Sequence, residues 1–354
     1  MDGRDKISVS QLLILLTLSR FFSLVAYSPQ ALEGGGNITI LTTLVSGVVQ
    51  YLALMLGIFF CRRSTGLSPL MAPGGAFFRV QSGIYWLFSM AVCVHSSTGF
   101  ISFMVTAIYD YRYTWVVALT FVAAGALAVS QGLEGLARGG GILMVLLGLG
   151  CGVIALGLWR QYDWLNFSYR LLPAAETARG AWQALAMNGE MFALLLLLCY
   201  VRGAPRAASC AGWVGAVTLG SAAVQLMTML TLGAYGAMKP FPVFTAVTSA
   251  GFQVFQRLDS IFLVIWVVLG LVRLSVFLAL ASSLSAGAFF RPWKARWVWG
   301  NAALVAAASL ALSGRMEWLE ALHKALATGV LTIGGVLLLP ALGWLLDAGR
   351  RKKG

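Results

Sequence analysis

Ten apolar stretches, each about as long as a membrane-spanning helix, fill most of this 354-residue chain. A bilayer core about 30 Å thick needs about 20 consecutive apolar residues in a helix. The stretches cover residues 8–28, 38–60, 82–109, 114–131, 141–159, 182–201, 211–236, 259–284, 297–313 and 326–346. The loops between them are too short to hold a soluble catalytic domain. We therefore predict an all-α integral membrane protein with about ten transmembrane helices.

The composition indicates the same class. Hydrophobic residues make up 59% of the chain and charged residues 10%, whereas ordinary globular proteins have about 25% charged residues. So few charges could not cover a soluble surface, which excludes a soluble enzyme, a disordered chain and a nucleic-acid-binding domain. The formal net charge of +13 comes from Lys and Arg in short loops beside apolar stretches, a pattern typical of topology signals and of contact with anionic lipids.

The basic residues also predict the orientation. With the N-terminus inside, the cytoplasmic segments hold 15 of the 25 Lys and Arg residues, and the outer loops hold eight. Because cytoplasmic loops carry an excess of Lys and Arg, both termini are expected in the cytoplasm, with residues 347–354 as a basic tail.

No residue pattern in the sequence indicates catalysis, a metal or a cofactor. The five cysteines lack C-x-x-C or Cys/His spacing and are expected to be small buried side chains. Paired carboxylates, H-E-x-x-H and nucleophile–base motifs are missing as well. We therefore expect a protein that is not an enzyme and that holds no metal or cofactor.

Four ionisable side chains fall inside the predicted spans, namely Arg20, His95, Glu190 and Arg273. Charges within a span are costly and usually mark a functional site. At about 1.5 Å of rise per residue, the first three each lie about 18 Å from the cytoplasmic face. Opposite charges at one depth predict a polar site between helices near the membrane midplane.

Each of these residues has an alternative role. Arg20 and Glu190 could form a structural ion pair with no ligand, and His95 could make interhelical hydrogen bonds. Arg273, about 21 Å below the outer face, could extend its guanidinium to the inner interface. The sequence leaves these alternatives open.

Two of the charges lie in segments that suit interrupted helices. The sixth span carries MNGEMF at 187–192, where Asn and Gly are poor helix formers. The first carries SRFFS at 19–23, without a glycine. Transporters with inverted repeats interrupt helices at the midplane and bind substrate there. In a five-plus-five arrangement the first and sixth helices are equivalent, so both are expected to be broken.

Five segments spread over the chain carry a family resemblance. They are KISVSQLLILLTLSR at 6–20 leading to Ser28 and Pro29, GLEGLAR at 132–138, DWLNFSYRLLP at 163–173, NGEMF at 188–192, and FPVFTAVTSAGFQVFQRLDSIFLVIWVVLG at 241–270. Together they resemble the B-subunit permeases of bacterial spore germinant receptors, the GerAB-type family of the amino acid/polyamine/organocation transporter superfamily. The RLDSIFLVIW portion and the glutamate of the sixth span are the most specific parts.

The resemblance implies one transmembrane domain, 1–354, with a LeuT-like fold. Its two inverted five-helix repeats would cover about 8–159 and 182–346. It also implies a multi-pass protein of the bacterial cell membrane or spore inner membrane. Such a protein senses a small germinant, often an amino acid, together with an A subunit and a lipoprotein C subunit.

By the same resemblance, the ligand would lie between the broken parts of helices 1 and 6 and the facing sides of helices 3 and 8. The implied ligand-binding residues are Ser19, Arg20, Phe21, Phe22, Ser23, His95, Ser96, Ser97, Asn188, Gly189, Glu190, Ile265 and Trp266. The superfamily usually has glycine in the helix 1 break, which SRFFS lacks. Arg20 would then either bind a substrate carboxylate or pair with Glu190, and Trp266 could instead face lipid.

Two functions fit these expectations. In the first, a germinant-sensing permease homologue binds a small zwitterion, with Glu190 on its ammonium group and Arg20 on its carboxylate, and a partner subunit detects the resulting helix movement. In the second, a secondary transporter moves an amino acid or amine, with proton coupling through Glu190 or His95.

Overall fold

The computed structural model describes residues 7–26, 36–63, 76–108, 111–167, 173–239, 241–251, 258–288, 294–313 and 315–351. Nearly all of these residues are helical, which confirms the prediction of an all-α chain. Ser28 and Pro29, part of the family-like segment at the start of the chain, lie outside the described residues.

Five long helices make up the first half of the chain. They are α1 (Val9–Ala26), α2 (Gly36–Arg63), α3 (Ala76–Ala107), α4 (Thr114–Ser130) and α5 (Leu133–Gly157). Short 3₁₀ turns join or follow them, namely η3 (Tyr111–Tyr113), η4 (Trp159–Gln161) and η5 (Trp164–Asn166).

The second half is more interrupted. Its helices are α6 (Ala174–Ala186), α7 (Glu190–Leu197), α8 (Ala207–Leu232), α9 (Pro242–Thr248), α10 (Asp259–Ala288), α11 (Lys294–Ser313), α12 (Met316–Ala327), α13 (Val330–Ile333) and α14 (Leu339–Arg351). The 3₁₀ turns η6 (Leu198–Tyr200) and η7 (Gly233–Met238) follow α7 and α8, and the π-helical segment η8 (Gly334–Leu338) joins α13 to α14. Strand β1 (Ile7–Ser8), just before α1, pairs in parallel with β2 (Val201–Arg202), which follows α7 and η6.

By length and hydropathy, six helices could each cross a membrane, and two bent helix pairs raise the number to eight. The single helices are α2, α3, α4, α5, α8 and α10, and the bent pairs are α6 with α7 and α11 with α12. Two further apolar helices, Val9–Leu24 and Val330–Leu346, are shorter. The chain is therefore a multi-pass helical membrane protein.

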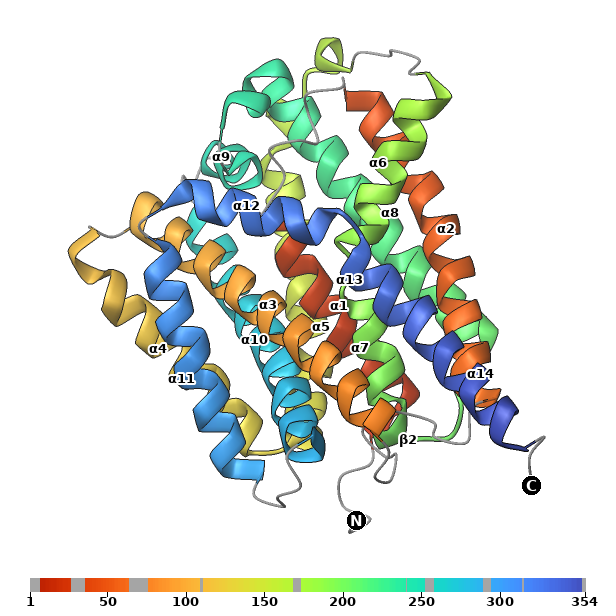
Figure 1. Ribbon diagram of the computed structural model, residues 1–354. Helices are drawn as coiled ribbons and strands as arrows, with labels where there is room; N and C mark the ends of the chain where they lie inside the picture. The colour runs from red at the N-terminus through yellow and green to blue at the C-terminus, as the bar shows by residue number, and fades with distance from the viewer. Residues whose placement is uncertain are drawn as a thin grey trace.

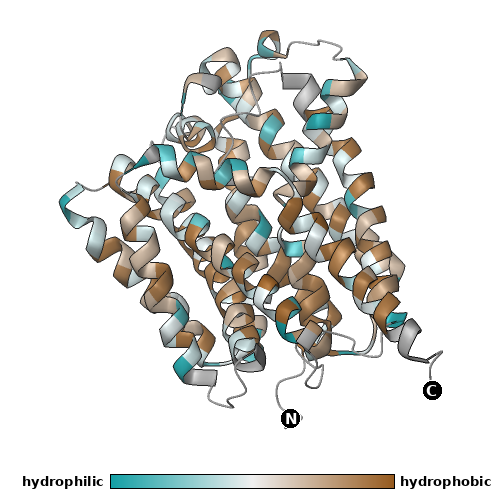
Figure 2. Cartoon of the chain, viewed as in Figure 1, coloured by the Kyte–Doolittle hydropathy of each residue, from teal (hydrophilic) through white to brown (hydrophobic). Residues whose placement is uncertain are grey.

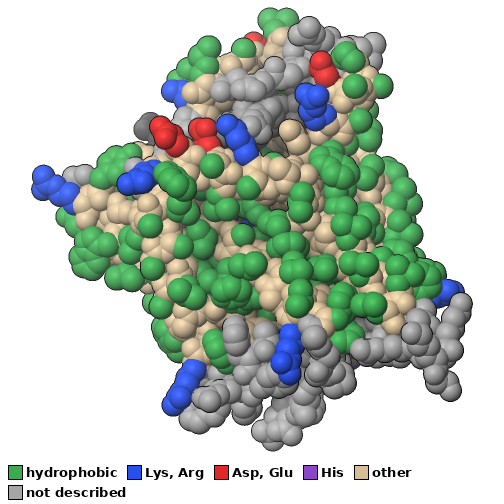
Figure 3. Space-filling view, in the orientation of Figure 1, with side chains coloured by type: hydrophobic (Ala, Val, Ile, Leu, Met, Phe, Trp, Pro, Cys, Tyr) green, Lys and Arg blue, Asp and Glu red, His purple; other side chains and the backbone are tan. Residues whose placement is uncertain are grey.

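The outer surface has the polarity that a bilayer requires. Apolar residues cover the middle of the helices, whereas hydrophilic residues are more frequent toward the two ends of the bundle (Figure 2). In the space-filling view, hydrophobic side chains form a continuous band, and charged side chains gather above and below it (Figure 3). Helix α5 shows the same feature, because Ile142, Val145 and Leu149 are each more than 60% exposed. Such side chains are stable in contact with lipid tails.

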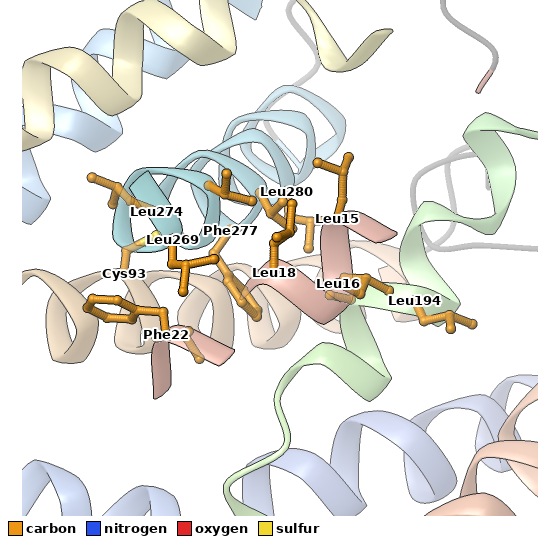
Figure 4. Packing of buried hydrophobic residues seen from close by; sticks show 14 of the residues in the cluster. Leu15, Leu16, Leu18, Phe22, Cys93, Leu194, Leu269, Leu274, Phe277 and Leu280 are labelled. Atoms are coloured by element: carbon orange, nitrogen blue, oxygen red, sulfur yellow. The ribbon is translucent and has the colours of Figure 1, made fainter. Parts of the chain in front are cut away.

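The core lies where α1, α3, α7 and α10 meet (Figures 1 and 4). Leu15 and Leu18 of α1, Leu194 of α7 and Phe277 of α10 are almost completely buried there. In a membrane, helices associate through close packing because lipid tails are as apolar as the side chains. Gly125 of α4 shows this packing, since a Cβ atom added to it would lie 2.7 Å from Leu274.

Helices α9 and α12 lie across one end of the bundle, whereas α1 begins and α14 ends at the other (Figure 1). Helix α12 bends by 119° from α11, so it cannot continue along the same span. The amphipathic sequence of α12, MEWLEALHKALA, explains this position, because one side carries charges and the other carries leucines.

The structure contradicts one expected interruption. Helix α1 is continuous from Val9 to Ala26 and passes through Arg20 without a break. SRFFS contains no glycine or proline, so no residue in it weakens the helix enough to open a turn. The expected interruption of the sixth span is present, because α6 ends at Ala186 and α7 begins at Glu190 with a bend of 43°.

Candidate functional site

The break between α6 and α7 organises the candidate site. Met187, Asn188 and Gly189 separate the two helices, and Asn and Gly are poor helix formers. Gly189 has helical dihedral angles, φ −61° and ψ −19°. It also has room for a methyl group, since an added Cβ would lie 3.4 Å from its nearest neighbour, Phe192. The weak helix propensity of this pair, rather than a positive φ, therefore accounts for the break.

Side chains from three other helices form hydrogen bonds with the residues at the break. Arg20 of α1 donates from Nη1 to the Met187 carbonyl oxygen at 2.6 Å. Thr332 of α13 donates to the Ala186 carbonyl oxygen at 2.5 Å. The side-chain amide of Asn188 donates to Gln50 Oε1 of α2 at 2.6 Å. The first two hydrogen bonds therefore satisfy backbone carbonyl groups at the break, and the third joins Asn188 to α2.

Glu190, the first residue of α7, is completely buried and makes the strongest contacts of the site. Its Oε1 atom forms an ion pair with Arg273 Nη1 of α10 and accepts a hydrogen bond from Ser19 Oγ of α1 at 2.8 Å. Arg273 also donates from Nε to Ser96 Oγ of α3 at 2.8 Å and from Nη1 to the Ser19 carbonyl oxygen at 3.2 Å. One ion pair therefore links α1, α3, α7 and α10.

We use the term central cluster for the residues at this junction that carry its charges and hydrogen bonds. They are Ser19, Arg20, Ser96, Asn188, Glu190 and Arg273. All six are at most 7% exposed. Ser97, the next residue of α3, is buried as well, and its Oγ atom has no hydrogen-bond partner among the described residues.

The structure corrects two expectations about these charges. Arg273 does not reach toward an interface, because it is 4% exposed and paired with Glu190. Arg20 is not the ion-pair partner of Glu190 and instead contacts Met187 and Ser23. Successive residues of a helix point about 100° apart, so Ser19 and Arg20 face different parts of the break, and only Ser19 meets the carboxylate.

Several polar atoms of the central cluster have no hydrogen-bond partner among the described residues. These atoms are Arg20 Nε, Asn188 Oδ1 and Glu190 Oε2, and all three are shielded from solvent. Buried polar groups are nearly always hydrogen-bonded in native structures, so each of these atoms calls for an explanation. They comprise a charged donor and two acceptors, so they could bind a ligand that carries both donors and acceptors.

An aromatic stack borders the cluster. Phe22 and Phe100 stack on Trp266, each with ring centroids 5.1 Å away, and Phe103 lies 4.3 Å from the same ring. The alternative that Trp266 faces lipid is wrong, because it is 2% exposed. Its Nε1–H has no acceptor among the residues that the structure describes.

Two of the expected site residues point away from the cluster. Phe21 packs on Gly220 of α8, where an added Cβ would lie 2.4 Å from its ring. Ile265 packs on Gly150 of α5 in the same manner. Ser23 lies one turn beyond Arg20 and accepts a 3.3 Å hydrogen bond from its Nη1 atom. Phe21 and Ile265 therefore belong to helix packing rather than to the central cluster.

His95 pairs with a residue that the sequence did not suggest. Its Nε2 atom lies 3.3 Å from Nδ1 of His323 on α12. This contact joins α3 to α12, which lies across one end of the bundle. The sequence analysis did not identify His323 or Gln50. The only indication in the sequence was one polar residue in an apolar stretch for Gln50 and one in an amphipathic segment for His323.

Metal coordination finds no support in the described part of the chain, where no group of three or more His, Cys, Asp or Glu side chains could hold an ion. The chemistry of the central cluster is that of ion pairing and hydrogen bonding.

A helix that is interrupted within a membrane span, beside buried charges, is a feature that many transporters share. The comparison with protein families agrees. Residues 7–305 match the spore permease family, whose description is spore germination protein. The match covers most of the chain, so the protein belongs to this family, which comprises transporters and receptors rather than typical enzymes. Among curated proteins, none matches this chain.

Proposed function

We propose that this member of the spore germination family is the germinant-sensing B subunit of a receptor and binds an amino acid at the central cluster. The observation that carries the proposal is the set of buried, unpartnered polar atoms beside the α6–α7 break. A ligand that satisfied them would remove a free-energy penalty of the empty site.

The chemistry of these atoms suits an amino acid. The carboxylate would accept from Arg20 Nε, a charged donor. The ammonium would donate to Glu190 Oε2 and Asn188 Oδ1. The other oxygen of Glu190, Oε1, remains paired with Arg273, and this ion pair would hold the Glu190 carboxylate in position for the ligand.

The fold that we propose is the LeuT-like arrangement of two inverted five-helix repeats, about 8–159 and 182–346, in a single domain, 1–354. Support comes from the break at 187–189, which lies within the first helix of the second repeat. A count of ten spans requires α1 and the segment Val330–Leu346 to cross the membrane as well. We also propose that both termini are cytoplasmic and that the protein lies in the spore inner membrane.

Sensing would depend on helix movement. The unpartnered atoms are shielded from solvent, so a ligand can reach them only if neighbouring helices part. A ligand that binds the open form better than the closed form shifts the population toward it. Helix α1 contacts both Glu190 and Arg273, so its position would report occupancy to the A and C subunits that we propose as partners.

A proton-coupled transporter of an amino acid or amine is the second candidate. Glu190, fully buried in a span, and the contact between His95 and His323 favour it, since such residues form proton relays in transporters. Uptake into proteoliposomes under a pH gradient separates the candidates. Accumulation that collapses with the gradient would favour transport, and binding without uptake would favour sensing.

The proposal is tested by thermal stabilisation of the purified protein across a panel of amino acids, sugars and nucleosides. We expect at least one amino acid to raise the unfolding temperature, and Glu190→Gln to abolish the rise. The matched control is Arg138→Gln, which removes a partner from an exposed ion pair with Glu134 on α5. No response to any amino acid, or an unchanged response in Glu190→Gln, would contradict the proposal.

A further inference from the structure

The central cluster contains more positive than negative charge. Arg20, Glu190 and Arg273 are 7%, 0% and 4% exposed, so two guanidinium groups share the site with one carboxylate. Glu190 is paired with Arg273. Arg20 contacts a backbone carbonyl and a hydroxyl, neither of which carries a compensating charge.

Among the residues that the structure describes, no second acid contacts Arg20. Of the 12 Asp and Glu residues, only Glu190 lies at the middle of a predicted span. The other acids whose side chains the structure describes lie near helix ends, in a loop or on α12, which lies across one end of the bundle (Figure 1). Examples are Asp259 at the start of α10 and Glu317 and Glu320 on α12. The two histidines, His95 and His323, contact each other and can add only further positive charge when protonated.

A buried charge without a counter-charge is costly in a medium of low polarity. A neutral zwitterion would satisfy the unpartnered atoms but would leave the excess charge in place. A ligand with one net negative charge would do both. Its ammonium group would meet Glu190 Oε2 and Asn188 Oδ1, one carboxylate would meet Arg20 Nε, and a second carboxylate would bring the site to neutrality.

We infer that the preferred ligand of the central cluster is an amino dicarboxylate, an acidic amino acid with one net negative charge, and that Arg20 determines this preference. The inference rests on the proposed function and specifies its ligand class. It requires Arg20 to act through its charge rather than through its shape.

Matched ligand pairs test the inference. Aspartate and asparagine have nearly the same shape, as do glutamate and glutamine, but each pair differs by one unit of charge. The apparent affinity from thermal stabilisation is expected to favour the acid of at least one pair by about tenfold or more, because unit charges interact strongly away from water. Arg20→Gln should remove this preference and Arg20→Lys should keep most of it, whereas the control Arg138→Gln should leave it unchanged.

The possible outcomes distinguish a failure of the inferred ligand class from a failure of the proposed function. Equal or better binding of the amide in both pairs would overturn the inference, as would an acid preference that persists in Arg20→Gln. If a neutral amino acid binds and Glu190→Gln abolishes its binding, the proposed function stands and the charge inference fails. If no amino acid binds at all, both fail.

Discussion

Glu190 forms an ion pair with Arg273, eighty-three positions further along the chain. It forms none with Arg20, although Arg20 is the next residue after Ser19, which donates a hydrogen bond to Glu190. This pairing leaves Arg20 without an ion-pair partner of its own among the described residues at the break between α6 and α7. It also joins the broken helix to α10, one of the most deeply buried helices of the bundle.

The ion pair should be important for stability. Removing one partner of a buried pair typically costs about 3–5 kcal/mol, because the other charge stays buried alone. Arg273→Met removes the guanidinium that contacts Glu190 and leaves Arg20 bound to the Met187 carbonyl, so we expect the free energy of unfolding to fall by about that amount. Arg138→Gln, which disrupts an exposed pair, should cost less than about 1 kcal/mol. Denaturant unfolding in mild detergent measures both, and similar losses would argue against a structural pair at Glu190.

Arg20 should behave in the opposite way to Arg273. Because its guanidinium has no acidic partner in the described structure, Arg20→Gln removes an uncompensated charge while keeping a donor for the Met187 carbonyl. We expect the ligand-free variant to be at least as stable as the wild-type protein in the same unfolding measurement. A loss as large as that of Arg273→Met would show that Arg20 has a counter-charge.

Trp266 carries a prediction about its nitrogen. The ring is stacked between phenylalanines, but its N–H has no acceptor among the described residues. Trp266→Phe should therefore cost far less than Trp266→Ala, for which losses of about 3–5 kcal/mol are typical. If both variants lose the same amount of stability, the indole N–H makes a stabilising contact. A ligand would then be the first candidate for its acceptor.

Much of the site was predictable because charges in an apolar span are rare. Glu190 stands out in the sequence, and the Asn and Gly before it predicted the break that the structure contains. The partner of Glu190 was not predictable. Arg273 and Arg20 both lie in spans, and the choice between them depends on how α1 and α10 rotate about their axes, which the all-apolar surroundings do not indicate.

The continuous α1 shows the limit of an argument from equivalent positions. The expected break rested on the equivalence of helices 1 and 6, although SRFFS lacks the helix-weakening residues of MNGEMF. The difference in helix propensity between the two segments explains why α1 is continuous whereas the sixth span is interrupted. Gln50 and His323 were missed because each is a single polar residue whose partner comes from a distant part of the chain.

The histidine contact should couple α12 to α3. His95→Ala and His323→Ala each remove the same 3.3 Å contact, so the double variant should be less destabilised than the sum of the two singles. A coupling of about 0.5–1.5 kcal/mol is expected for one hydrogen bond. Additive losses in unfolding experiments would show that the two rings do not interact.

Tight helix packing gives a test of the fold itself. A Cβ atom at Gly125 would lie 2.7 Å from Leu274, whereas one at Gly148 would have no neighbour within 4 Å. Gly125→Ala should therefore destabilise the protein by about 1–3 kcal/mol. Gly148→Ala should be neutral or slightly stabilising, since alanine favours helices. If Gly148→Ala lowers the unfolding temperature more than Gly125→Ala, the packing of α4 and α5 differs from that in the structure.

The most direct test of the central cluster is equilibrium binding of a radiolabelled acidic amino acid to purified wild-type protein, Glu190→Gln and Arg138→Gln. The account predicts saturable binding to one site in the wild-type protein and in Arg138→Gln, weakened by about tenfold or more in Glu190→Gln. Binding to Glu190→Gln with unchanged affinity would contradict the account, because the ligand would then lie elsewhere.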